Sequence, residues 1–222
     1  MTRTVLVTGT DTGVGKTVVT AALARSLRAR GRRVVALKPL ESGCEPMPGP
    51  LEDGALLARA AGQPAPAHAL HRYREPIAPA DAAEREGTPV ALADLVREID
   101  RFRAGADVAL VEGAGGLLSP LSWAWGHPEL AEALGADVLL AAADRLGTIN
   151  HVLLTLAALR QRGRPVLGLV LSAPAEADAS TGHNASAVAR AEPGLRIATL
   201  GRLDATGLES ARLDDVAAWL SA

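Results

Sequence analysis

The chain has 222 residues, 48% of them hydrophobic, with 23 basic and 25 acidic side chains and a formal charge of −2. This length is enough for one sizeable core, and we expect a single domain over residues 1–222. Both signs of charge are scattered along the sequence. That distribution excludes an electrostatic surface for nucleic acid or an anionic membrane, so the expected partners are small molecules.

Cysteine usage and the length of apolar runs indicate the compartment. The one cysteine, Cys44, excludes an intramolecular disulfide framework, and the first four residues lead into a strand pattern rather than an apolar signal core. The longest apolar runs, such as residues 138–143, are strand-sized and far below the about 20 residues that span a bilayer. We therefore expect a soluble protein of the reducing cytoplasm.

Short runs rich in valine and leucine alternate along the chain with segments of helical period rich in alanine, leucine and arginine. This alternation predicts an α/β fold, a mostly parallel sheet with helices on both faces. The predicted strands are residues 4–8, 34–38, 108–112, 138–143, 167–172 and 197–200. The predicted helices are residues 16–30, 53–61, 94–102, 148–162 and 213–220.

Two stretches carry little regular pattern. Residues 45–89 are rich in proline, glycine and alanine, and apart from the helix at 53–61 they are expected to form an elaborated crossover that shapes a site. The polar residues 174–184 are predicted to form a loop that leads into a helix.

The strongest motif joins the first predicted strand to the first predicted helix. It reads Gly9-Thr10-Asp11-Thr12-Gly13-Val14-Gly15-Lys16-Thr17. In this context the motif is typical of a P-loop, in which backbone N–H groups and a helix N-terminus surround phosphate oxygens. Lys16 is expected to bridge the β- and γ-phosphates of ATP, and Thr17 to offer its hydroxyl to Mg²⁺. The predicted nucleotide contacts in this loop are Gly13, Val14, Gly15, Lys16, Thr17 and Val18.

This loop departs from the usual pattern by one position. The glycine expected six positions before the lysine is Thr10 here, and Gly9 stands one step earlier. The loop is therefore a longer variant. A glycine-rich turn that binds no nucleotide is the alternative interpretation.

The third predicted strand ends in an acid, Glu112. A turn of small residues follows, Gly113-Ala114-Gly115-Gly116, where the backbone can approach a bound nucleotide closely. The carboxyl end of a strand in an open parallel sheet faces the binding crevice, so Glu112 is placed to hold Mg²⁺ together with Thr17. An acid that only caps the following turn is the alternative.

The second predicted strand ends in Lys38-Pro39 and runs into Leu40-Glu41-Ser42-Gly43. Lys38 would then project at the same sheet edge as Lys16 and Glu112. A second cation beside a γ-phosphate indicates an anionic phosphoryl acceptor, and a solvated strand-end lysine is the alternative. We expect Glu41 to point outward, away from this anion site.

Four motifs occur in the order that dethiobiotin synthetases show, and together they resemble that family. They are the P-loop, residues 38–43, Val111-Glu112-Gly113-Ala114-Gly115-Gly116-Leu117-Leu118 and Leu146-Gly147-Thr148-Ile149-Asn150-His151. The resemblance implies that 7,8-diaminononanoate, CO₂ and Mg-ATP give dethiobiotin, ADP and phosphate. One amine would take up CO₂ as a carbamate, its oxygen would attack the γ-phosphate, and the second amine would close the ring.

The same resemblance implies roles for single residues at the substrate. Thr12 and Ser42 would hydrogen-bond the diamine or the carbamate, and Lys38 would be the catalytic lysine beside Lys16. The carbamate and the γ-phosphate are both anions, and their reaction requires positive groups close to both.

For the metal, the resemblance implies three oxygen ligands. The predicted Mg²⁺ ligands are Thr17, Asp53 and Glu112. Glu52 is the alternative to Asp53, because a shift of one residue would exchange them, and a helix N-cap role competes with metal binding by Asp53.

The fourth motif begins a predicted helix, whose free N–H groups could bind the carboxylate of the substrate. The residues concerned are Gly147, Thr148 and Asn150, and a plain N-cap by Thr148 is the alternative. In the family this helix end reaches the site of the neighbouring subunit, which implies a homodimer with active sites at the interface.

Two places depart from the family pattern. Ser172-Ala173 stands where an asparagine usually reads adenine, and Leu203-Asp204-Ala205-Thr206 replaces a turn that usually contains proline. We therefore expect other nucleoside triphosphates to be accepted beside ATP.

A rival interpretation is a nucleotide-switched partitioning ATPase on the same scaffold. Such proteins usually carry a lysine early in the P-loop, where this chain has Thr10 and Asp11, and they tend to present a basic surface, which this composition does not indicate.

Overall fold

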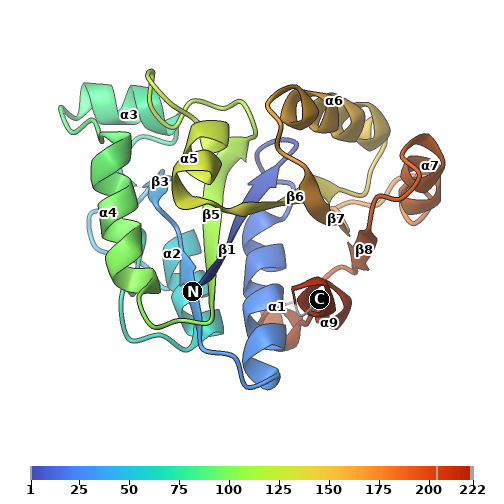
Figure 1. Cartoon of the computed structure of the whole chain (residues 1–222), viewed down its shortest axis with the longest axis horizontal. Coiled ribbons are helices and arrows are strands. Elements are labelled where there is room, and N and C mark those ends of the chain that lie inside the picture. Colours follow the sequence, from blue (N-terminus) through green and yellow to red (C-terminus); the bar gives the residue numbers. More distant parts are fainter. Residues whose placement is uncertain (1, 204, 221–222) are drawn as a thin grey trace.

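The computed structural model describes residues 2–203 and 205–220. Over these residues the main sheet has the strand order β2-β5-β1-β6-β7-β8, and all neighbouring strands are parallel (Figure 1). Its strands are β1 (Arg3–Gly9), β2 (Val34–Leu37), β5 (Val108–Gly116), β6 (Asp137–Ala143), β7 (Val166–Ser172) and β8 (Ile197–Leu200). A small second sheet pairs β3 (Leu40–Ser42) with β4 (His71–Tyr73), also in parallel.

Helices cover both faces of the main sheet. They are α1 (Lys16–Ala29), α2 (Asp53–Ala61), α3 (Pro79–Arg85), α4 (Leu92–Arg103), α5 (His127–Leu134), α6 (Thr148–Gln161), α7 (Asn184–Ala191), α8 (Ala205–Ser210) and α9 (Asp214–Trp219). Figure 1 shows α3, α4 and α5 gathered at one end of the sheet and α6, α7 and α9 at the other. Among the described residues no helix is both long and apolar enough to cross a membrane.

Alternation along β1 separates the apolar side chains on the two faces of the sheet. In β1, Val5 and Val7 pack with α1, α2 and α9, whereas Leu6 packs with α4 and α5 on the opposite face. Side chains of a strand alternate between the faces of the sheet, so the continuous apolar runs expected of a buried parallel strand fill both cores. This packing places the carboxyl ends of β1, β2 and β5 side by side.

The α/β fold with a mostly parallel sheet is confirmed, and all six predicted strands are present. β5 continues to Gly116 instead of ending at residue 112, because β1 and β5 pair again at Gly9 and Gly116 after a register break. The helix predicted at 53–61 has the predicted bounds. The polar residues 174–184 do lead into a helix, α7.

The prediction missed five short elements of the described chain. β3 and β4 have three residues each, and α3, α5 and α8 have at most eight, too few to show a hydrophobic period. The expected departure from the family pattern at residues 203–206 includes Asp204. This residue lies outside the described residues.

Candidate active site

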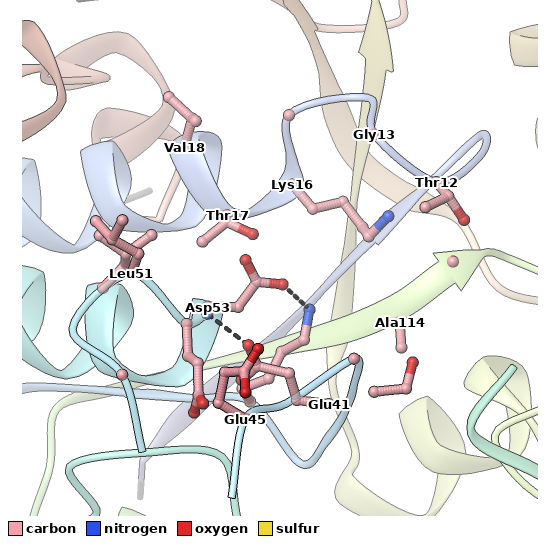
Figure 2. A pocket seen from close by; sticks show the side chains of 18 of the residues that line it. Thr12, Gly13, Lys16, Thr17, Val18, Glu41, Glu45, Leu51, Asp53 and Ala114 are labelled. Carbon is pink, nitrogen blue, oxygen red and sulfur yellow. Dashed lines mark hydrogen bonds and ion pairs between the residues drawn. The ribbon is translucent and has the colours of Figure 1, made fainter. Parts of the chain in front are cut away.

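The carboxyl ends of β1, β2 and β5 open onto a cavity of about 860 Å³. The predicted site residues that line it are Thr12, Gly13, Gly15, Lys16, Thr17, Val18, Lys38, Ser42, Asp53, Ala114 and Gly115. Figure 2 shows Thr17, Lys16 and Asp53 facing the same space. Most of the predicted nucleotide and substrate residues are therefore in one place.

Six predicted residues lie outside this lining. Glu112, which is fully buried, and Gly113 lie on β5. Val14 is buried in the core on the α1 side of the sheet, so only its backbone is available to a nucleotide. Gly147, Thr148 and Asn150 lie at the start of α6 and do not line the cavity of their own chain.

The P-loop has the backbone that its glycines predict. Gly13 and Gly15 have φ values of 71° and 89°, a region that side chains disfavour. Lys16 is buried and donates a hydrogen bond from Nζ to the carbonyl oxygen of Asp11 at 2.9 Å. Burial and the neighbouring Lys38 lower the pKa of Lys16 to about 8. Anionic phosphates would relieve the burial cost of this ammonium.

Lys38 is the centre of a buried polar cluster and is only 4% exposed. Its Nζ lies 2.7 Å from Asp53 Oδ2, 2.7 Å from Glu112 Oε1 and 3.3 Å from the carbonyl oxygen of Gly113. Burial alone would lower the pKa of Lys38, but Glu112 and Asp53 together raise it above the usual value. Lys38 is therefore a fixed positive charge between two carboxylates, and not the solvated strand-end lysine of the alternative interpretation.

Thr17 joins this cluster from α1. Its hydroxyl donates to Glu112 Oε1 at 2.8 Å. The other oxygen of Glu112, Oε2, is buried and has no hydrogen-bond partner among the described residues. A buried carboxylate oxygen normally has a partner. Because Thr17, Asp53 and Glu112 offer only oxygen atoms as ligands, they fit a hard cation such as Mg²⁺.

Asp53 and Glu52 have different partners in the structure. Asp53 directs its carboxylate toward Lys38, and although burial favours the neutral acid, the charge of Lys38 lowers the pKa of Asp53. Glu52 instead pairs with Arg72 at 2.5 Å. Helix α2 begins at Asp53, and the Asp53 side chain does not cap it. The competing N-cap role of Asp53 is thus not seen.

The expectation that Glu41 points outward is wrong. Glu41 is buried, and its carboxylate accepts hydrogen bonds from the backbone N–H groups of Asp53 at 2.6 Å and Gly54 at 3.0 Å. The chain leaves the main sheet after Leu37 and enters the small β3–β4 sheet at Leu40, so the alternation of the second predicted strand does not extend to Glu41.

His127, at the start of α5, was missed by sequence reasoning. Its imidazole is fully buried, and neither ring nitrogen has a hydrogen-bond partner among the described residues. Burial and then the charge of Lys16 lower its pKa to about 3, so the ring is neutral at physiological pH. A Cβ built on Gly113 would lie within 3.0 Å of this ring. The backbone of Gly113 is therefore in direct contact with the His127 ring.

Ser172 and Cys44 are both enclosed. A Cβ on Gly15 would lie within 3.0 Å of the Ser172 hydroxyl, so Ser172 packs against the P-loop. Cys44 is buried, and burial followed by the charge of Glu41 raises its pKa to about 11. A thiol with so high a pKa is a poor nucleophile at neutral pH, in agreement with an ordinary free cysteine.

Known proteins resemble the chain in sequence. A protein-family model described as an AAA domain matches residues 3–208. ATP-dependent dethiobiotin synthetase BioD of Anaeromyxobacter dehalogenans is 44% identical over 191 residues, which are 85% of each chain. The BioD proteins of Anaeromyxobacter sp. strain Fw109-5 and Xanthomonas oryzae pv. oryzae are 42% and 43% identical, over 88% and 74% of this chain and 90% and 75% of theirs.

Solved structures share the fold at much lower identity. The septum site-determining protein MinD of Pyrococcus horikoshii, in complex with Mg-ADP, is 15% identical with a TM-score of 0.56, over 96% of this chain and 88% of that one. A ParA family ATPase from Chlorobium tepidum is 12% identical with a TM-score of 0.57, over 100% and 92%. At such identities the likeness shows the P-loop fold alone and lends no support to a partitioning function.

Proposed function

The chain belongs to the dethiobiotin synthetase family, and from this premise we propose that it closes the cyclic urea of dethiobiotin from 7,8-diaminononanoate, CO₂ and ATP. The observation that carries the proposal is the pair of buried ammonium groups, Lys16 and Lys38, at one cavity. A carbamate that attacks a γ-phosphate brings two anions together, and fixed cations stabilise that encounter without reorganisation.

Each lysine has its own task in the proposed reaction. Lys16, on the P-loop, binds the phosphate that the carbamate oxygen attacks. Lys38 lies deeper, and its position among Asp53, Glu112 and the Gly113 carbonyl fixes where its charge acts. We assign Thr12 and Ser42, which line the same cavity, to hydrogen bonds with the diamine or carbamate. Phosphorylation then makes the carbamate oxygen a good leaving group for ring closure.

We propose that Thr17, Asp53 and Glu112 hold Mg²⁺. The unpartnered Oε2 of Glu112 supports this assignment, and so does the oxygen-only chemistry of the set. When bound, the ion neutralises phosphate charge as the γ-phosphoryl group is transferred. Glu112 is fully buried and held by Lys38 and Thr17, so its orientation does not depend on solvent.

We further propose a homodimer in which Gly147, Thr148 and Asn150 bind the substrate carboxylate in the site of the partner subunit. Two observations support it: these residues do not line the cavity of their own chain, and Leu146 and Leu154 beside them are 81% and 62% exposed. Leu146 precedes α6 and Leu154 lies on it, and apolar side chains exposed together are typical of an interface. Sedimentation at twice the 22.8 kDa chain mass would support the dimer, and a monomer at assay concentration would exclude it.

We propose that residues 1–222 act as one domain in the cytoplasm. Clustering of the site at one edge of the main sheet supports the first statement. The single cysteine, which leaves no intramolecular disulfide to form, supports the second. Cell fractionation with an antibody to the chain tests the location.

The function is tested by phosphate release from Mg-ATP with and without 7,8-diaminononanoate and CO₂, with mass detection of dethiobiotin. We expect phosphate release to require both the diamine and CO₂ and to match the dethiobiotin formed. Phosphate release that is indifferent to the diamine would overturn the proposal and favour a nucleotide-switched ATPase.

Nucleotide selectivity is expected to be weak. Ser172 packs on Gly15, so its hydroxyl replaces the longer asparagine side chain that reads adenine in the family, and a site without a dedicated hydrogen-bonding group discriminates poorly. We predict that turnover with CTP or GTP stays within about tenfold of turnover with ATP, measured as dethiobiotin formed at equal nucleotide concentration. A preference for ATP of a hundredfold or more would contradict this.

A further inference from the structure

Glu41 makes contacts that none of the proposed roles uses. It lies on β3, is 7% exposed, and accepts hydrogen bonds from the backbone N–H groups of Asp53 and Gly54. Figure 2 shows the dashed line that joins Glu41 to Asp53, below Thr17. The carboxylate thus binds the first two backbone N–H groups of α2.

The Glu41 carboxylate takes the place of an N-cap side chain at the start of α2. The residue before the helix, Glu52, makes no side-chain cap hydrogen bond. The first N–H groups of a helix lack intrahelical partners, and a negative charge beside them is stabilising. Glu41 supplies both the acceptor and the charge from another element of the fold, so the start of α2 is tied to β3.

Two further contacts restrict the same helix end. A Cβ on Gly54 would lie within 3.0 Å of the Ala69 backbone nitrogen, so α2 begins in direct contact with the chain that enters β4. Glu52 is paired with Arg72 of β4, the residue that lies opposite Glu41 in the β3–β4 sheet. The small sheet therefore holds the residues on either side of Asp53.

The held backbone fixes the Asp53 side chain. Asp53 Oδ2 lies 2.7 Å from Lys38 Nζ, and the Asp53 side chain is 37% exposed. A half-exposed carboxylate has freedom to rotate toward solvent unless its backbone and its partner hold it. Glu41 controls the first of these constraints and Lys38 the second.

We propose that Glu41 is a positioning residue that sets Asp53 for cation binding. The inference rests on the proposed role of Asp53 as a Mg²⁺ ligand, and it extends that role to a residue whose carboxylate binds the backbone of Asp53. Groups that orient metal ligands commonly change metal affinity by about 10- to 100-fold when they are removed.

The test is Mn²⁺ binding in the presence of saturating ADP, followed as free Mn²⁺ by electron paramagnetic resonance. We expect Glu41→Ala to weaken Mn²⁺ binding about tenfold, and Glu41→Gln, which keeps one acceptor oxygen, to weaken it less. The matched control is Glu45→Ala. Glu45 is exposed and lines the same cavity, so its removal deletes the same charge without freeing α2 and should change the affinity less than about twofold.

A double-mutant cycle separates positioning from general damage. In an Asp53→Ala background, Glu41→Ala should cause no further weakening, because the residue that it positions is gone. Equal weakening in both backgrounds would overturn the proposal, and so would wild-type affinity in Glu41→Ala. These outcomes concern metal binding and do not test the proposed reaction. The proposed reaction is overturned only if the wild-type chain makes no dethiobiotin.

Discussion

Replacement of Lys38 by methionine is expected to reduce dethiobiotin formation by about a hundred- to a thousandfold, the effect of removing one preorganised group that stabilises developing charge. ADP binding should persist, because the P-loop and Lys16 are unchanged. The same variant should lose stability. Glu112 is fully buried, and Asp53 lies beside the same ammonium. Removal of the charge between two carboxylates is expected to lower the free energy of unfolding by about 3–5 kcal/mol.

The measurements are product formation, ADP affinity by calorimetry and urea unfolding. The matched control is Arg85→Met, which removes a positive charge that is paired with both Glu75 and Asp81 at the surface. Exposed pairs contribute at most about 1 kcal/mol, so this control should retain activity and most of its stability. If Lys38→Met unfolded at the wild-type urea concentration, the buried charge cluster would not have the energetic role assigned to it.

Much of the site could be predicted because parallel strands share one edge. Once the P-loop fixed the polarity of the first strand, Lys38 and Glu112 at the ends of two other predicted strands had to lie near Lys16. The structure places Lys38 and Glu112 within 2.7 Å of each other. This prediction used strand ends only, so the missed short elements did not affect it.

Glu41 and His127 could not be found in the same way. The orientation of Glu41 depends on a turn at Pro39 and on the pairing of β3 with β4, which contains only three residue pairs. His127 begins a helix of eight residues and has no local pattern that would announce its contact with the loop after Glu112. The sequence did contain a signal at Gly113, the residue that His127 contacts. Gly113 follows a buried acid in a strand, and such a glycine indicates close approach of another group.

That close approach leads to the second large effect, expected for Gly113→Ala. A Cβ at this position would lie within 3.0 Å of the imidazole of His127. The ring is fully buried and cannot move aside into solvent, so the backbone of residue 113 must shift. This backbone supplies the carbonyl oxygen that contacts Lys38. We expect the free energy of unfolding to fall by about 3 kcal/mol, the upper part of the range for overpacked cores, with loss of ring-closing activity.

The contact between Gly113 and His127 predicts that a second substitution, at His127, restores part of the stability that Gly113→Ala loses. His127→Ala removes the obstructing ring. Gly113→Ala combined with His127→Ala should therefore be more stable, by about 2 kcal/mol, than the sum of the single effects predicts. Gly201→Ala is the control, since a Cβ there meets no atom within 4 Å and φ is not positive. Additive single effects in urea unfolding would show that the glycine is required for another reason.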